Sequence, residues 1–223
     1  AEVSLLRYAA GLAEAGIEAA LAAAAPGITE AELARLIAAT MVAGGAEPRF
    51  VVATVGERTS LADAFPTDRE WRPGELARFD VGCVYAGYWS DMARTAVLGA
   101  SDRVQQDRYA ALLAGEEEQL ALARPGVTAS ELFDAAVRVV EAHGLRPYRR
   151  HHCGHGIGLS VYEPPIISPG VETPLRAGMT FCFETPYYEV GWGGMMVEDT
   201  LVVTDRGVEL LTSSSRELRV VGS

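Results

Sequence analysis

The sequence lacks the features that mark several large classes of protein. Its three cysteines are an odd number without framework spacing, which excludes a disulfide scaffold and favours a reducing compartment, the cytoplasm. Acidic residues outnumber basic ones, and a net charge of -11 argues against nucleic acid or an anionic membrane as a partner. The longest apolar run, 17–26, is too short to span a bilayer, and no secretory signal is visible.

What remains has the composition of an ordinary globular protein. Hydrophobic residues make up 49% of the chain and charged residues 22%, so 223 residues can bury a sizeable core. No low-complexity tail or linker divides the sequence. We therefore expect one domain over residues 1–223.

Hydrophobic periodicity predicts helices in two pairs, separated by groups of strands. This segregation favours the α+β class over a strict alternation of strand and helix. The acidic run EEEQ, from Glu116, is expected on a solvated helix face. Helices are predicted over 3–25, 30–44, 105–124 and 129–143, and strands over 50–55, 76–84, 88–97, 180–185, 195–204 and 208–211.

Two phrases occur twice in the same order. PGITEAELARL, from Pro26, resembles PGVTASELFDA, from Pro125, and PGELARFD resembles the later AGMTFCFE. Thr29 and Thr128 each stand before an acid-containing apolar run, where a helix N-cap is expected. The pattern indicates an internal duplication, with two similar halves that each contribute acids to a shared site.

Four acids and one histidine stand in hydrophobic or glycine-rich segments. Acids that lie close together raise one another's pKa and cannot all ionise unless a cation compensates them. Two divalent ions would balance four carboxylates, and oxygen ligands with one imidazole suit Mn, Co, Fe or Zn better than a thiolate site would. The five are Asp80 in ARFDVG, Asp91 in YWSDMART, His155 in HHCGHGIGL, Glu184 in TFCFETP and Glu198 in MMVEDTLVV.

The spacing of the acids suggests two pairs. A tight turn at 86–87 would return the chain as a hairpin and bring Asp91 near Asp80. Glu184 and Glu198 form the counterpart pair in the second half, with a glycine-rich segment between them. The sequence alone therefore predicts a binuclear metalloenzyme.

These motifs resemble those of the pita-bread metallopeptidases, which include methionine aminopeptidases, Xaa-Pro aminopeptidases and prolidases. GYWSDMART, GHGIGL and VEDTLVVTDRG match the family's motifs, and PTDRE points to the proline-peptide branch. The resemblance implies the pita-bread fold around a central metal site, without that branch's usual N-terminal domain. It implies two divalent ions, Mn or Co first and Zn or Fe next, and the homodimer as one expected assembly. It also implies Asp80, Asp91, His155, Glu184 and Glu198 as ligands, with Asp91 and Glu198 bridging both metals and Glu184 accepting a proton.

The chain departs from the family's pattern in the residues around the ligands. Asp63 in ADAFPTD and Tyr162 in VYEPP stand where relatives carry histidine, and Met196 stands where they carry arginine. His151, four residues before His155, matches the histidine that is kept. Asp63 could act as a base or bind a substrate amine, and Tyr162 could donate a hydrogen bond to an oxyanion.

Three functions follow from these motifs. The first is a metal-dependent hydrolase resembling Xaa-Pro aminopeptidases and dipeptidases, in which a metal-bridging hydroxide cleaves the N-terminal bond of short proline-containing peptides. The second is a non-peptidase hydrolase or lyase of this fold acting on a small amino-acid-derived metabolite, which Asp63 favours. The third is a catalytically weakened binding homologue, which the complete ligand set argues against.

Overall fold

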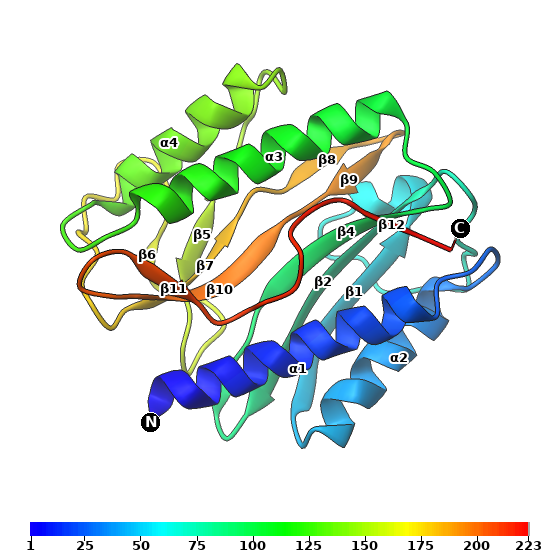
Figure 1. Ribbon diagram of the computed structural model, residues 1–223, viewed down its shortest axis with the longest axis horizontal. Helices are drawn as coiled ribbons and strands as arrows, with labels where there is room; N and C mark the ends of the chain where they lie inside the picture. The colour runs from blue at the N-terminus through cyan, green and yellow to red at the C-terminus, as the bar shows by residue number, and fades with distance from the viewer. Residues whose placement is uncertain (223) are drawn as a thin grey trace.

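Two helix pairs alternate with two groups of strands in the computed structural model, which describes residues 1–222 (Figure 1). The helices are α1 (Glu2–Ala22), α2 (Glu30–Ala43), α3 (Arg103–Leu122) and α4 (Ala129–Ala142), with a 3-10 turn η1 (Gly56–Ser60). The strands are β1 (Glu47–Val55), β2 (Leu76–Tyr85), β3 (Tyr88–Trp89), β4 (Met92–Leu98), β5 (Gly154–Gly156), β6 (Glu163–Ile166), β7 (Thr180–Glu184), β8 (Tyr187–Glu189), β9 (Gly193–Met195), β10 (Glu198–Val203), β11 (Val208–Leu210) and β12 (Arg219–Val221).

One large curved sheet joins the two halves. Its main path runs β1-β2-β4-β10-β7-β5-β6, and β3, β11 and β12 pair with β2, β10 and β4. The first half supplies β1, β2 and β4, and the second supplies β10, β7, β5 and β6. The antiparallel contact of β4 with β10, at Ala93 and Glu198, is therefore the junction between the halves.

The duplication predicted from sequence is visible at the helix starts. Thr29 and Thr128 each form a complete capping box, with Glu32 and Glu131 respectively. Each threonine also forms an isolated antiparallel β-bridge to a later segment, Thr29 to Glu70 and Thr128 to Pro174. Because a capping box satisfies donors that would otherwise be orphaned, the repeated phrase fixes where α2 and α4 begin.

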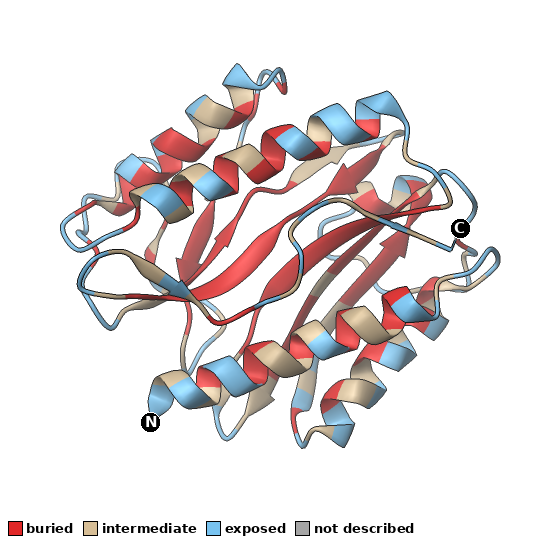
Figure 2. Cartoon of the chain, in the orientation of Figure 1, coloured by how far each residue is buried: buried red, intermediate tan, exposed pale blue. Residues whose placement is uncertain are grey.

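Both helix pairs cover the same face of the sheet (Figure 1). Phe79 packs in the core under α1 and α2, and Phe183 packs in the core under α3 and α4. Successive side chains of a strand point to opposite faces. Asp80 and Glu184, the next residues along, therefore face away from the helices. Figure 2 shows the central strands as mostly buried, with exposed residues on the outer sides of the helices.

The predicted elements agree with this architecture except at breaks in two strands near the acids and at several short strands. All four helices were predicted to within three residues at each end. The expected strand 88–97 is interrupted at Ser90 and Asp91, and the expected strand 195–204 is interrupted at Met196 and Val197. The short strands β5, β6, β8 and β12 were not predicted. Among residues 1–222, no helix combines the length and the apolar character needed to cross a bilayer.

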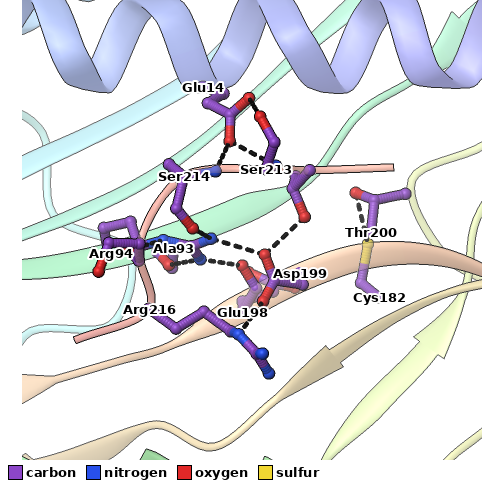
Figure 3. A network of polar contacts seen from close by, with 12 residues as sticks. Glu14, Ala93, Arg94, Cys182, Glu198, Asp199, Thr200, Ser213, Ser214 and Arg216 are labelled. Atoms are coloured by element: carbon purple, nitrogen blue, oxygen red, sulfur yellow. Dashed lines mark hydrogen bonds and ion pairs between the residues drawn. The ribbon is translucent and has the colours of Figure 1, made fainter. Parts of the chain in front are cut away.

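A buried ionic network lies behind the junction of the halves (Figure 3). Arg94 Nη2 donates to Asp199 Oδ1 at 2.6 Å, and Arg94 Nη1 donates to the Glu198 carbonyl at 2.7 Å. Thr212 Oγ1 donates to the same Asp199 oxygen at 2.5 Å. Arg94 and Asp199 are at most 2% exposed. The network thus ties β4 to β10 and to the C-terminal segment.

Glu116 of α3 corrects the expectation of a solvated acidic face. Its side chain is fully buried, and neither carboxylate oxygen has a hydrogen-bond partner within residues 1–222. Burial and the nearby Asp199 hold the pKa of Glu116 well above its usual range, against the lowering influence of Arg94. The residues of EEEQ do not share one helix face: Glu116 and Gln119 turn into the core, and Glu117 is exposed.

We expect Arg94→Met to destabilise the protein by about 3 kcal/mol, because it leaves the buried Asp199 carboxylate without its closest cation, with only Arg216 at 3.7 Å. Urea unfolding followed by circular dichroism would measure the change. Arg103→Met is the matched control, since Arg103 makes an exposed i,i+4 ion pair with Asp107 and should change stability by less than about 0.5 kcal/mol. Equal effects of the two substitutions would contradict a structural role for the buried pair.

Candidate metal centre

Three of the predicted ligands lie in one row across the sheet. Asp80 of β2 pairs with Ala93 of β4, Ala93 pairs with Glu198 of β10, and Glu198 pairs with Glu184 of β7. Cross-strand partners point to the same face. The strand register therefore gathers the Asp80, Glu198 and Glu184 carboxylates on the face that no helix covers.

Asp91 and His155 join this row from its two sides. Asp91 precedes β4 by one residue and lies two residues before Ala93, while His155 pairs with Cys182 across β5 and β7. His155 Nε2 lies 3.6 Å from Asp91 Oδ2, and the other ring nitrogen lies 3.0 Å from the Gly156 carbonyl. That second contact orients the imidazole, so that Nε2 faces the acids.

The predicted hairpin brings Asp91 back toward Asp80 as expected. Tyr85 pairs with Tyr88, and the two residues between them, Ala86 and Gly87, both have positive φ, at 50° and 87°. Two positive φ values in a two-residue loop are the geometry of a type I′ turn, which matches the twist of antiparallel strands.

Cys182 lies under the same cluster. One ligand atom from each of Asp91, His155, Cys182 and Glu198 falls within 4.8 Å of the others. The Cys182 thiol donates to the Asp91 carbonyl at 3.5 Å and lies 3.6 Å from Thr200 Oγ1. Burial, with Asp91 and Glu198 nearby, raises the pKa of this thiol well above its usual range. We therefore place Cys182 in the floor of the site as a neutral thiol.

The cluster is electrostatically unfavourable without a cation. Burial, with the charge of Asp91 next in size, raises the pKa of Asp80 to about 7. Burial likewise raises the pKa of Asp91 and, together with Asp91 and Glu184, that of Glu198. For Glu184 the effect of burial is outweighed by His152, which holds the pKa of Glu184 below its usual range.

The donor set fits hard divalent cations. Asp91 Oδ1 and Glu198 Oε2 are buried and make no hydrogen bond to any residue that the structure describes, and Glu184 Oε1 has only the contact with His152 Nδ1 at 2.7 Å. Buried oxygens are left unsatisfied at a cost of several kcal/mol unless something binds them. Carboxylate oxygens with one imidazole match the preferences of Mn, Co, Fe and Zn. The orphaned oxygens converge on one place, so the residues present fit a metal centre.

Arg78 fixes one edge of the centre. This fully buried side chain donates from Nη1 to Asp80 Oδ2 at 3.1 Å. Its other nitrogens donate to the carbonyls of Thr59, Leu61 and Ala62 at 2.7 to 3.1 Å. A fully buried arginine with four acceptors is a rigid support, because the planar guanidinium has little freedom left. Arg78 thus holds both a candidate ligand and the loop that leads to Asp63.

Met196 and Arg78 both lie beside the Tyr188 side chain. Tyr188 Oη is 3.9 Å from Met196 Sδ, and the guanidinium of Arg78 lies 5.2 Å from the centre of the Tyr188 ring. Relatives were expected to carry arginine at the position of Met196. In this chain the cations next to that ring are Arg78 of β2 and Arg150, whose guanidinium lies 5.5 Å from the ring centre.

The histidine beside Glu184 requires a correction. His152 Nδ1 lies 2.7 Å from Glu184 Oε1, whereas His151 is exposed. Gly154, the first residue of β5, has φ 135° and interrupts the alternation of side chains there. Cys153 consequently turns into the core under α3 and α4, and His152, not the predicted His151, faces the acids.

Tyr162 and Asp63 lie at the opening of the site. The Tyr162 ring stacks on the His155 ring, with centres 3.8 Å apart and planes 23° apart. Asp63 is exposed on the loop held by Arg78. Both residues line a cavity of about 500 Å³ that also reaches Asp80 and Asp91. The structure therefore brings together every predicted site residue except His151, and adds His152, Arg78 and Cys182.

Comparisons with known proteins agree with this geometry. The profile of metallopeptidase family M24 matches residues 4–205. The Xaa-Pro dipeptidase of Pyrococcus furiosus is 33% identical over 219 residues, which are 97% of this chain and 63% of that protein. Among solved structures, the dipeptidase PepE of Mycobacterium ulcerans superposes with a TM-score of 0.93 at 36% identity, covering 100% of this chain and 60% of that one. The X-Pro aminopeptidase of Thermotoga maritima gives 0.93 at 29% identity, covering 99% and 62%.

The chain thus spans somewhat under two thirds of the length of these relatives. The match covers both halves of the sheet and all the segments that carry the acids. Membership of this family implies a divalent metal, and the buried acids supply a candidate site for it. The chain belongs to metallopeptidase family M24, in its Xaa-Pro dipeptidase and prolidase branch, and has the pita-bread fold.

Proposed function

We propose that this chain catalyses the metal-dependent hydrolysis of the N-terminal peptide bond of short proline-containing peptides. Asp80, Asp91, His155, Glu184 and Glu198 would hold two divalent ions. The observation that carries the proposal is the set of orphaned carboxylate oxygens that converge beside an open cavity of about 500 Å³. A cavity of this size admits a dipeptide or a tripeptide.

The metal pair, when bound, would polarise the scissile carbonyl and lower the pKa of a water molecule. Glu184 would accept the proton of the attacking water. His152, 2.7 Å from a Glu184 oxygen, would orient this carboxylate and share its proton. The proton then has a route toward the leaving amine without leaving the site.

Tyr162 and Asp63 would contact the substrate. Stacking on His155 places the Tyr162 ring beside a ligand, where its hydroxyl can donate to the developing oxyanion. Burial and then the charge of Glu184 raise the pKa of Tyr162 far above its usual range, so the hydroxyl keeps its proton and remains a donor. Asp63 at the rim would bind the free amine of the peptide by charge attraction.

A second candidate is the hydrolysis of a small amino-acid-derived metabolite by the same centre. It is favoured by the acidic lining of the opening, where Asp63 replaces a neutral or cationic side chain. The two candidates differ in substrate and share the metal centre. A panel of peptides and of small amides separates them.

We expect protein loaded with Mn²⁺ or Co²⁺ to release the N-terminal residue from Xaa-Pro dipeptides, and Asp91→Asn to lower kcat/KM by at least about a hundredfold. The substitution removes one charge and one carboxylate oxygen from the residues that would hold the metal. Amino-acid release measured by chromatography would give the rates. Asp107→Asn, on the exposed face of α3, is the matched control and should keep wild-type activity.

Metal content measured on the same samples decides the interpretation of a negative result. Wild-type protein that carries its metal but hydrolyses no peptide would reject the peptidase proposal and favour the small-metabolite alternative. Wild-type protein that binds less than one ion per chain at saturation would reject the metal centre itself.

The pH dependence of metal stabilisation follows from the raised pKa values. Asp80, Asp91 and Glu198 bind protons more tightly in the folded metal-free protein than in the unfolded chain. Their contribution to stability is therefore full below about pH 4 and is lost as the pH rises toward the folded pKa of Asp80, about 7. Metal binding needs the deprotonated ligands, so the affinity for the metal increases over the same pH interval.

We therefore expect the rise in Tm caused by saturating Mn²⁺ to grow steadily between about pH 5 and pH 8. Differential scanning fluorimetry with and without the metal would measure it. Calorimetry at pH 6 in two buffers of different ionisation enthalpy should show proton release on binding. A shift in Tm that does not change with pH would contradict protonated carboxyls at this site.

A further inference from the structure

A buried glutamine of α3 reaches the chain segment that carries the histidine beside Glu184. Gln119 is fully buried, and its Nε2 donates to the Cys153 carbonyl at 2.8 Å. The Gln119 Oε1 atom is also buried and has no hydrogen-bond partner within residues 1–222. An unsatisfied acceptor in the core is destabilising. Packing alone therefore does not account for a glutamine at this position.

The Cys153 carbonyl connects α3 to the backbone of a candidate metal ligand. Besides the Gln119 amide, this carbonyl accepts the Glu184 N–H at 3.4 Å. Gly154 pairs with Phe183 across β5 and β7, so the contact between Cys153 and Glu184 continues that ladder by one residue. The Cys153 side chain packs in the core under α3 and α4. One backbone carbonyl thus receives hydrogen bonds from the helix and from the strand that carries Glu184.

The chain around Cys153 has few restraints of its own. Residues 145–153 lie between α4 and β5 and form no helix or strand. Gly154 follows with φ 135°, and a Cβ atom there would lie 2.4 Å from the Cys182 carbonyl oxygen. Glycine is therefore required at this position, and glycine restricts its own backbone less than any other residue. The orientation of the preceding residues must be fixed by hydrogen bonds from other segments.

Hydrogen bonds from two sides supply this restraint. Cys153 N–H donates to the Ile167 carbonyl at 2.8 Å, which fixes the segment on the strand side. The Cys153 carbonyl is fixed on the helix side by Gln119. The distance from Gln119 Nε2, 2.8 Å, is shorter than the 3.4 Å from the Glu184 nitrogen, so Gln119 is the better placed of the two donors.

The direction of the His152 side chain depends on this arrangement. His152 Nδ1 lies 2.7 Å from Glu184 Oε1, and the imidazole is 23% exposed. His152 is the residue immediately before Cys153, so a turn of the backbone at Cys153 would move the imidazole relative to Glu184. A shift of a few tenths of an ångström already weakens a hydrogen bond of this length.

We propose that Gln119 is a positioning residue of the metal centre, because its hydrogen bond to the Cys153 carbonyl directs His152 at Glu184. The kinetic consequence rests on the proposed function, in which His152 orients Glu184 and shares its proton. The geometric consequence does not rest on that function, because it concerns the metal-free protein and is measured there.

The geometric test is a nitrogen NMR spectrum of the imidazoles in the metal-free protein. The chain has four histidines, so His152→Asn identifies the His152 signals by their loss. In wild type the Nδ1 atom of His152 should carry a proton, because the carboxylate oxygen opposite it only accepts hydrogen bonds. In Gln119→Met this Nδ1–H signal should weaken as the two tautomers mix, while the His151 signals keep their wild-type positions.

The kinetic test is a double-mutant cycle on Mn²⁺-loaded protein with an Xaa-Pro dipeptide. Gln119→Met should lower kcat about tenfold and change KM by less than about twofold, within the range for residues coupled through one network. In a His152→Ala background the same substitution should change kcat by less than about twofold, because the residue through which Gln119 acts is absent.

Gln105→Met is the matched control. Gln105 is also a buried amide of α3, which donates to the Gly74 carbonyl at 2.9 Å and takes part in the capping box of the helix. Its loss weakens α3 without touching the Cys153 segment, so it should leave the His152 signals unchanged. Its effect on kcat should be the same with and without His152→Ala. Gln119→Leu is a second variant without a donor, and thermal unfolding verifies that each variant is folded.

Three results would overturn the proposal. They are His152 signals that stay at their wild-type positions in both Gln119 variants, a loss of kcat in Gln119→Met that persists fully in the His152→Ala background, and an equal change of the His152 signals in Gln105→Met. Wild-type protein that carries Mn²⁺ but hydrolyses no peptide would reject the proposed function alone. The spectra then decide, since altered His152 signals in the Gln119 variants support the positioning role and unaltered signals reject it.

Discussion

Repulsion among clustered carboxylates is the constraint on which the rest of this structure depends. Asp80, Glu198 and Glu184 lie in one cross-strand row, and Asp91 stands beside them. Adjacent like charges on one sheet face are destabilising. Ordinary sheets avoid the arrangement, so a fold that imposes it must hold the strands together by other means and must offer the acids a cation.

The interactions that hold the strands together lie on the opposite face of the sheet. Two helix pairs bury aromatic and aliphatic residues of the same strands, with Phe79 and Phe183 next in sequence to two of the acids. The period of two in a strand separates these tasks residue by residue. Stability is gained on the helix side, where apolar burial is worth about 25 cal/mol per Å². The acid side can therefore be shaped by its chemistry.

Two buried arginines bind the acid cluster, one from each face of the sheet. Arg78 donates directly to Asp80 on the acid side, and Arg94 donates to the backbone carbonyl of Glu198 while neutralising Asp199 behind the sheet. Each is buried and has several acceptors, so each is rigid. The pKa values of Glu198 and Glu116, which have no such direct contact, lie well above their usual range, and burial raises the pKa of Asp80 to about 7 despite Arg78. These carboxyls are the ones that retain protons most readily in the metal-free protein.

The sequence predicted the parts of the site that depend on strands and turns. Asp80, Glu184 and Glu198 stand in strands whose hydrophobic neighbours show which way the chain faces, and the turn at Ala86 and Gly87 needs only local geometry. The helices were predicted well because capping boxes and apolar stripes are local signals. The α+β class and the duplication followed from the order of these elements.

The parts that were missed depend on irregular backbone or on distant packing. His152 replaces His151 because of one glycine at φ 135°, which no spacing rule anticipates. Arg49 faces the cavity because of a bulge, and a bulge depends on the register with another strand. Glu116 is buried because of what α3 meets in the folded protein. A departure from regular periodicity could have been suspected only where glycine stood next to a candidate ligand.

The same backbone irregularities make the edges of the centre chemically different from one another. Regular strands place three acids in the cross-strand row, and the outer two, Asp80 and Glu184, stand at matching places in the two halves. The bulge at Arg49, the glycine before His155 and the loop bound by Arg78 each break that symmetry at a different edge. One edge becomes cationic, one carries a histidine beside Glu184, and one presents Asp63. A molecule that enters the cavity therefore meets different charges at its different edges, and this asymmetry can orient it in front of the clustered acids.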